Sequence, residues 1–93
     1  MLEIRLYCEN CGKFLPNDSD EAMICSYECT FCQDCVHKIL FNVCPNCGGG
    51  FEKRPTRPSV QLKKYPPKQD MIVKTVLNNK YLEANKNIPP RKR

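Results

Sequence analysis

The eight cysteines constrain this chain more than any other feature, because they stand in four pairs with metal-ligand spacing. In chain order the pairs are Cys8-x2-Cys11, Cys25-x3-Cys29, Cys32-x2-Cys35 and Cys44-x2-Cys47. A gap of two or three residues lets one turn of backbone direct two thiolates at a common ion, about 2.3 Å from each sulfur when the ion is Zn²⁺. Two tetrahedral ions need eight ligands, and the chain supplies eight. The spacing therefore predicts two Zn²⁺ ions bound by cysteine alone.

The size of the cysteine-bearing region supports metal binding. All the cysteines fall in the first 47 of 93 residues, and a domain of about 50 residues buries too little apolar surface to be stable without metals or disulfides. No apolar run is long enough for a signal peptide or a membrane span, so we expect a cytoplasmic protein, where paired cysteines bind metal more often than they oxidise. Disulfides and an iron–sulfur cluster are the alternatives, although the cysteines from 25 to 35 differ in their order of gaps from the bacterial ferredoxin run.

Charge divides the chain into two unlike parts. Residues 1–51 carry three Lys/Arg and seven Asp/Glu, a formal charge of −4, whereas residues 52–93 carry twelve Lys/Arg and three Asp/Glu, a formal charge of +9. Two Zn²⁺ ions on eight thiolates would bring the first part to about −8. The opposite charges suggest that the second part either stays solvated or folds against the first, and a contact made by charge would weaken in high salt.

Periodicity predicts short elements between the cysteine pairs. Alternation over residues 2–7 favours a half-buried strand, and residues 22–24 favour a second. Val36, Ile39 and Leu40 lie on one face of a predicted short helix over 33–41. Phe51 is expected to fold back onto the cysteine-bearing region.

Composition then gives the domain boundaries. We expect a two-zinc domain over residues 1–53 and a basic, proline-rich linker over 54–70. A mostly flexible tail over 71–93 follows, with a possible short helix over 71–85 capped by Asp70. The fold class predicted is a small metal-stabilised α+β domain with short strands and one short helix, followed by a basic flexible tail.

The residues alone leave three ways to combine four pairs on two ions. Sequential pairing makes two separate ribbons, and nested pairing joins the outermost pairs. A cross-brace joins the first pair with the third and the second with the fourth, which clamps both ends of the region to its middle. Because only two residues separate Cys29 from Cys32, neighbouring pairs can readily point in opposite directions.

The order and spacing of the cysteines resemble the RING-finger family, with Cys29 where that family usually carries histidine. Residues 1 to about 58 more closely resemble a family of short bacterial proteins of unknown function. The matching motifs are Leu2-Glu3-x-Arg5, Leu15-Pro16, Cys25-Ser26-x-Glu28-Cys29-Thr30-Phe31-Cys32, Cys44-Pro45-Asn46-Cys47-Gly48-Gly49, Arg54-Pro55 and Arg57-Pro58. The resemblance implies a RING-like cross-brace, with Cys8, Cys11, Cys32 and Cys35 on one zinc and Cys25, Cys29, Cys44 and Cys47 on the other.

We expect a structural zinc module that binds another protein, because four thiolates leave a zinc ion no open position for a substrate. No catalytic set of residues is readable, so we predict neither an enzyme nor a small-molecule substrate, and no membrane partner. His37 is a solvated side chain in this interpretation. Nucleic-acid binding through the basic tail is the alternative. Ubiquitin-ligase activity is less favoured, since Asn10 and Gly48 stand where RING ligases carry aliphatic and basic residues.

Overall fold

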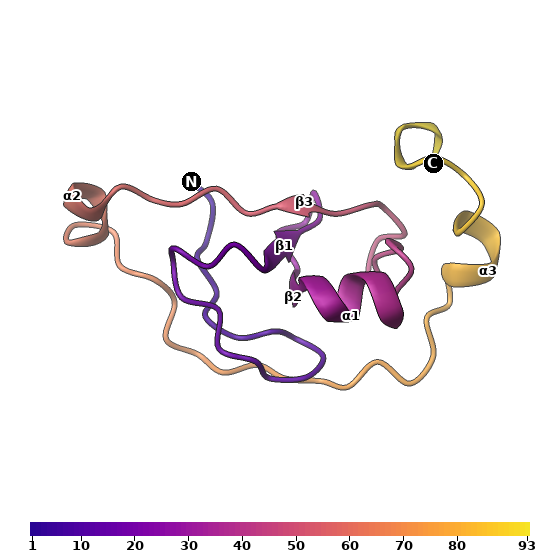
Figure 1. Cartoon of the computed structure of the whole chain (residues 1–93), viewed down its shortest axis with the longest axis horizontal. Helices are drawn as coiled ribbons and strands as arrows, with labels where there is room; N and C mark the ends of the chain where they lie inside the picture. The colour runs from indigo at the N-terminus through magenta and orange to yellow at the C-terminus, as the bar shows by residue number, and fades with distance from the viewer.

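The computed structural model describes residues 1–93 and is built around a small antiparallel sheet (Figure 1). Strand β1 (Ala22–Ile24) lies in the middle, with β2 (Thr30–Cys32) on one side and β3 (Glu52–Lys53) on the other. Met23 pairs with Phe31 across one ladder and with Lys53 across the other. The predicted second strand, over 22–24, is thus confirmed, and it becomes the central one.

Helix α1 (Gln33–Lys38) follows β2 without a connecting loop. Asp34 lies in its first turn, and His37 and Lys38 lie in its last, which suits the direction of the helix dipole. Val36 and Leu40 are fully buried, as the predicted apolar face requires, but Ile39 is 46% exposed because the helix ends before it. The helix is therefore confirmed, three residues shorter than its predicted end at 41.

The core is assembled largely from the cysteines themselves. Phe31 and Phe51 pack edge to face with ring centroids 5.5 Å apart, so the predicted return of Phe51 is confirmed. Six of the thirteen residues in the buried cluster are cysteines; its members are Cys8, Leu15, Ala22, Met23, Cys25, Cys29, Phe31, Cys32, Cys35, Val36, Leu40, Cys44 and Phe51. With so few aliphatic side chains this region buries little apolar surface, so a metal ion bound by the thiols would supply much of its stability.

Regular secondary structure contributes little to the backbone bonding. Only 8 of the 35 backbone–backbone hydrogen bonds lie within helices and strands, so turns and loops carry the rest. The predicted strand over residues 2–7 is an example, since it forms only isolated bridges, Tyr7 with Phe14 and Arg5 with Lys68. Loops that lack the hydrogen-bonded ladder of a sheet need other links to hold them in place, and the cysteine clusters join such loops.

The C-terminal part of the chain returns along the head, by which we mean residues 1–53. After α2 (Ser59–Leu62) it runs extended past the N-terminal loops and reaches α3 (Leu82–Asn85) and a short 3-10 turn, η1 (Pro90–Lys92), at the other end of the molecule (Figure 1). The helix predicted over 71–85 is thus wrong except for its last four residues. The reason is tertiary: Lys74 N–H donates to the Glu9 carbonyl at 2.7 Å, so it is not available for a helical bond.

None of the helices has the length and apolar character needed to cross a membrane.

Candidate metal centre

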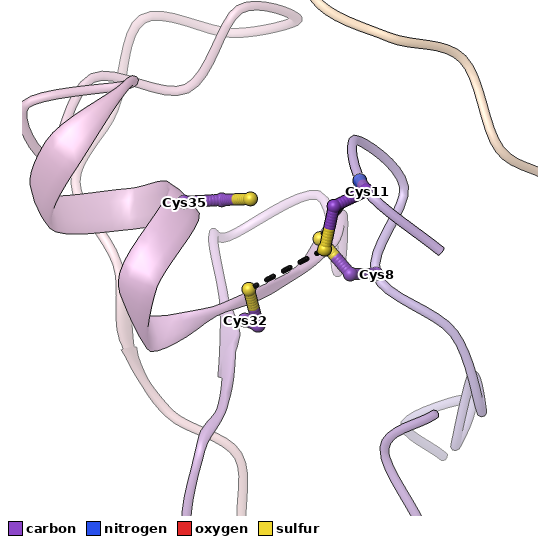
Figure 2. Close-up of side chains that lie close together, drawn as sticks. All are labelled: Cys8, Cys11, Cys32 and Cys35. Carbon is purple, nitrogen blue, oxygen red and sulfur yellow. Dashed lines mark hydrogen bonds between the residues drawn. The ribbon is translucent and has the colours of Figure 1, made fainter. Parts of the chain in front are cut away.

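The first and third cysteine pairs meet in one cluster (Figure 2). Cys8 and Cys11 come from an N-terminal loop, while Cys32 ends β2 and Cys35 lies in the first turn of α1. The four sulfur atoms all lie within 4.8 Å of one another, and those of Cys11 and Cys32 are 3.7 Å apart. A tetrahedral ion with sulfur ligands at 2.3 Å requires sulfur–sulfur separations of about 3.8 Å. The cluster could hold one metal ion with little adjustment.

The second and fourth pairs meet in another cluster, to which Cys29 belongs by its place directly before β2. Cys25, Cys44 and Cys47 have their sulfur atoms within 4.8 Å of one another, and those of Cys25 and Cys44 are 3.6 Å apart. Cys29 lies beside this trio, and its sulfur accepts from Asn46 Nδ2 at 3.3 Å, but it falls outside the 4.8 Å limit for at least one of the three. The structure thus brings together the sulfur sets expected from the resemblance, one of them less tightly. Their ligation by zinc stays a prediction.

The loop that carries the first cysteine pair and the loop that carries the last adopt the same type of turn. Each follows the order Cys-x-Asn-Cys-Gly, at residues 8–12 and at residues 44–48. In each, the N–H of the glycine donates to the carbonyl of the first cysteine, and Gly12 and Gly48 have the same φ of 79°. A side chain disfavours that left-handed conformation, which explains a glycine at both places.

Amide groups surround the sulfur atoms in a pattern typical of metal-bound thiolates. Backbone N–H groups of Cys11, Asn46 and Gly49 donate to the sulfurs of Cys8, Cys44 and Cys47 at 3.4–3.5 Å. N–H donors stabilise the charged form of the sulfur, and outer groups of this kind orient the ligands of metal sites.

Sequence reasoning gave the asparagine of neither loop a role at the sulfur atoms. Asn10 Nδ2 donates to Cys35 Sγ at 3.3 Å, and Asn46 Nδ2 donates to Cys29 Sγ at 3.3 Å. Each asparagine therefore reaches across its cluster to a cysteine from the middle of the chain. The repeated Cys-x-Asn-Cys-Gly order was the available signal, because it places the same amide at the same point of two similar sites.

The thiol groups titrate as sets rather than singly. Burial raises the pKa of Cys35 and of Cys32. In the second cluster, hydrogen bonding with the thiols of Cys25 and Cys44 lowers the pKa of Cys29. The interaction between Cys25 and Cys29 in turn raises the pKa of Cys25 to about 11. One thiolate is thus favoured at the expense of its neighbours, and a cation would be needed to ionise all four. Metal uptake should therefore release protons.

An ion-pair network fixes the first loop to the sheet. Glu9 Oε2 accepts from the Thr30 N–H at 2.5 Å and from Arg5 Nη1 at 3.0 Å. The hydrogen bond from Arg5 lowers the pKa of Glu3, which completes the network. Glu9, which lies between Cys8 and Cys11, therefore attaches the loop to β2 through both the N–H and the carbonyl of Thr30.

His37 belongs to neither cluster. It lies exposed on α1, and both clusters of side chains that could hold a metal ion consist of cysteines alone.

Fold and site together define a small cysteine-rich α+β protein with two cysteine clusters that could bind metal ions. Residues 1–57 match the model of a family described as "Protein of unknown function (DUF1272)", and the chain belongs to this family. The resemblance to short bacterial proteins of unknown function is thereby confirmed.

A relative from Rhizobium meliloti (strain 1021), "Uncharacterized protein R02474", is 50% identical over 74 residues, which cover 80% of this chain and 88% of the relative. Because 74 residues exceed the 57 of the family match, the similarity includes part of the chain beyond the head. No solved structure matches the chain.

Proposed function

We propose that the protein is a structural zinc module of two cross-braced sites that presents a surface to another protein. The observation that carries this is the placement of four sulfur atoms, Cys8, Cys11, Cys32 and Cys35, within 4.8 Å of one another. Soft thiolate ligands in a tetrahedral set select Zn²⁺ or an iron–sulfur cluster. Zinc is favoured because four thiolates close its coordination and the sites then serve only to hold the fold.

Metal stoichiometry and chelation test the zinc sites. Native mass spectrometry of the purified protein should show two Zn²⁺ ions per chain, and a strong chelator should unfold the head, as followed by circular dichroism. Cys29→Ala should likewise unfold the second site region rather than leave a folded protein with two ions. A brown protein with visible absorption and bound iron would contradict zinc, and a folded chain without any metal would contradict metal binding altogether.

The exposed side chain of Phe41 supports a role in protein binding. Phe41 is 56% exposed and adopts a φ of 48°, followed by Asn42 at 58°. A bulky residue in the left-handed region is strained by about 1–3 kcal/mol, and such strain concentrates at functional positions. Ile39, two residues earlier, is also exposed. We infer that these two apolar side chains enter an apolar recess of a partner protein.

A photo-reactive amino acid at position 41 tests this contact. The expected result is one cross-linked partner of defined mass in a lysate, competed away by excess unlabelled wild type. Phe41→Gly should compete at least tenfold less well while retaining full stability, because glycine relieves the backbone strain. Lys38→Ala, an exposed change at the end of α1 and three residues before Phe41, is the control and should compete as wild type. Cross-linking only to a second copy of the chain would mean that Phe41 contacts another molecule of this protein and not a different partner.

The exposed basic side chains of the linker and the tail support nucleic-acid binding as the second candidate. Lys63, Lys64, Lys74 and Lys80 are exposed, because the tail contacts the head through other groups. Binding would be electrostatic, so its affinity for a duplex oligonucleotide should fall steeply with salt and depend little on sequence. Binding that is insensitive to charge reversal of these lysines would contradict it.

Ubiquitin-ligase activity has less support. The two positions that RING ligases use for docking, Asn10 and Gly48, are covered by the tail: Val76 N–H bonds to Asn10, and Asn85 bonds to the Gly48 carbonyl.

A further inference from the structure

Asn10 stands between the first cysteine cluster and the tail. Its side chain is buried, with 6% of the residue exposed. Nδ2 donates to Cys35 Sγ at 3.3 Å, and Oδ1 accepts from the Val76 N–H at 2.7 Å. The Val76 N–H can only donate, so it requires the amide oxygen, and the NH₂ group is then turned toward the sulfur. The contact with the tail therefore sets the direction in which Asn10 donates.

The equivalent residue of the other cluster lacks this second contact. Asn46 Nδ2 donates to Cys29 Sγ at the same 3.3 Å, but Asn46 is exposed and makes no hydrogen bond to the tail. The tail bonds the second loop instead through the carbonyls on either side of it, Asn79 Nδ2 to Val43 O at 2.8 Å and Asn85 Nδ2 to Gly48 O at 3.0 Å. Two similar sites thus differ in one connection.

We propose that Asn10 is a positioning residue that couples metal binding at the cluster of Cys8, Cys11, Cys32 and Cys35 to the docking of the tail on the head. The inference rests on the proposed metal binding. Groups outside the ligand shell that hydrogen-bond a ligand typically change metal affinity 10- to 100-fold when they are removed. An amide held by Val76 donates to Cys35 without first losing rotational freedom, so tail docking strengthens the site.

The coupling works in both directions. If tail docking raises the metal affinity of the first cluster by some factor, metal at that cluster raises the affinity of the head for the tail by the same factor. A nucleic acid or a protein that pulls Val76 away from Asn10 would loosen the first site, whereas no such bond reaches the asparagine of the second. The tail thereby reports the metal occupancy of one site of the two.

Val76→Pro tests the coupling in the full-length chain, because proline lacks the N–H that Asn10 accepts. Leu77→Pro is the matched control: Leu77 is 92% exposed and its N–H has no hydrogen-bond partner in the structure. Val76→Ala keeps the N–H and accounts for the loss of the valine side chain, which packs against the core. Asn10→Ala and Asn46→Ala remove the two amides in turn.

Affinity is measured for each site separately. The protein is loaded with ¹¹³Cd²⁺, its two resonances are assigned through the cysteine protons, and a chelator is titrated. Loss of one neutral hydrogen bond predicts about 5-fold weaker binding at the first cluster in Val76→Pro, with the second cluster unchanged. Leu77→Pro and Val76→Ala should bind as wild type at both. Asn10→Ala should weaken only the first cluster and Asn46→Ala only the second, by 10-fold or more.

Hydrogen exchange of residues 74–79 gives the reciprocal readout. Asn10→Ala should speed exchange there, and Asn46→Ala should not. The coupling is overturned if Val76→Pro and Leu77→Pro have equal affinities at the first cluster, or if Val76→Pro weakens both clusters alike. Wild-type protein that takes up no metal would instead overturn the proposed function, which this design detects before any variant is compared.

Discussion

At the scale of single residues, Arg54 is the least expected feature, because its charged side chain is buried with 4% of the residue exposed. Its guanidinium donates to three carbonyls, of Arg5 at 2.6 Å, Leu15 at 3.0 Å and Pro16 at 2.8 Å. No carboxylate lies within ion-pair distance, and burial lowers the pKa of Arg54. The side chain therefore joins the N-terminal segment and the following loop to the residue that succeeds β3.

Removing this side chain should destabilise the head. Arg54→Ala leaves the carbonyls of Arg5 and Leu15 without a donor and the Pro16 carbonyl with the Ser19 N–H alone, and we expect a loss of about 3 kcal/mol in the free energy of unfolding. The measurement is urea denaturation of the metal-loaded protein. Lys53→Ala, at an exposed neighbouring position, should cost less than about 0.5 kcal/mol. Equal losses in the two variants would mean that the three hydrogen bonds contribute nothing net.

At the scale of elements, the two Cys-x-Asn-Cys-Gly loops repeat one turn in two environments. Gly12 faces Met71 and Val73 at ordinary contact distances of 3.5 Å or more from where a Cβ would lie. At Gly48 the same added atom would lie 2.7 Å from Asn85 Nδ2 and 3.0 Å from Tyr81. The loops have the same backbone conformation, but the tail is packed more closely on the second.

A pair of alanine substitutions separates these two effects. Gly12→Ala should cost about 1–2 kcal/mol from the left-handed backbone alone. Gly48→Ala should cost the same and also displace α3, so that limited proteolysis cuts the chain near residues 80–86. Urea denaturation measures the first effect and the cleavage rate measures the second. Equal cleavage in both variants would show that α3 does not depend on contact with the second loop.

At the scale of the whole molecule, the head and the tail carry opposite charges but meet largely through neutral groups, with one exception, the Arg93 guanidinium, which donates to the Asn42 carbonyl at 2.6 Å. Four of their hydrogen bonds use backbone or amide groups: Lys74 N to Glu9 O, Val76 N to Asn10 Oδ1, Asn79 Nδ2 to Val43 O, and Asn85 Nδ2 to Gly48 O. No ion pair joins the tail to the head, and the linker before it has a single one, Lys68 with Glu3 at 3.4 Å on the surface. Surface pairs of this kind contribute little, so the charge asymmetry does not hold the tail in place.

Salt should therefore leave the tail docked, contrary to the expectation from charge alone. Raising NaCl from about 0.1 M to about 1 M shortens the screening length from about 10 Å to about 3 Å. X-ray scattering should give an unchanged radius of gyration across that range; the Cα value is 13.3 Å. A double variant, Asn79→Ala with Asn85→Ala, should be larger at both concentrations. Expansion of the wild type with salt would show that charge attraction holds the tail on the head.

Whether the sequence predicts an element correctly depends on how far apart along the chain the residues that form it lie. Helix α1 and strand β1 are readable because their apolar positions repeat locally. The helix predicted over 71–85 fails because Asn10 and Glu9, more than sixty residues away, accept the N–H groups of Val76 and Lys74. Such distant partners leave no trace in local periodicity.

What was determined by the chain alone is its inventory of groups. Four cysteine pairs, a glycine after each terminal pair and an acidic head before a basic tail all depend on local spacing and composition. The meeting of the first pair with the third, the burial of Arg54 and the path of the tail over both loops were decided only in three dimensions. Each of these depends on contacts between segments twenty or more residues apart, and local spacing permits several such combinations. The packing of those segments selects one.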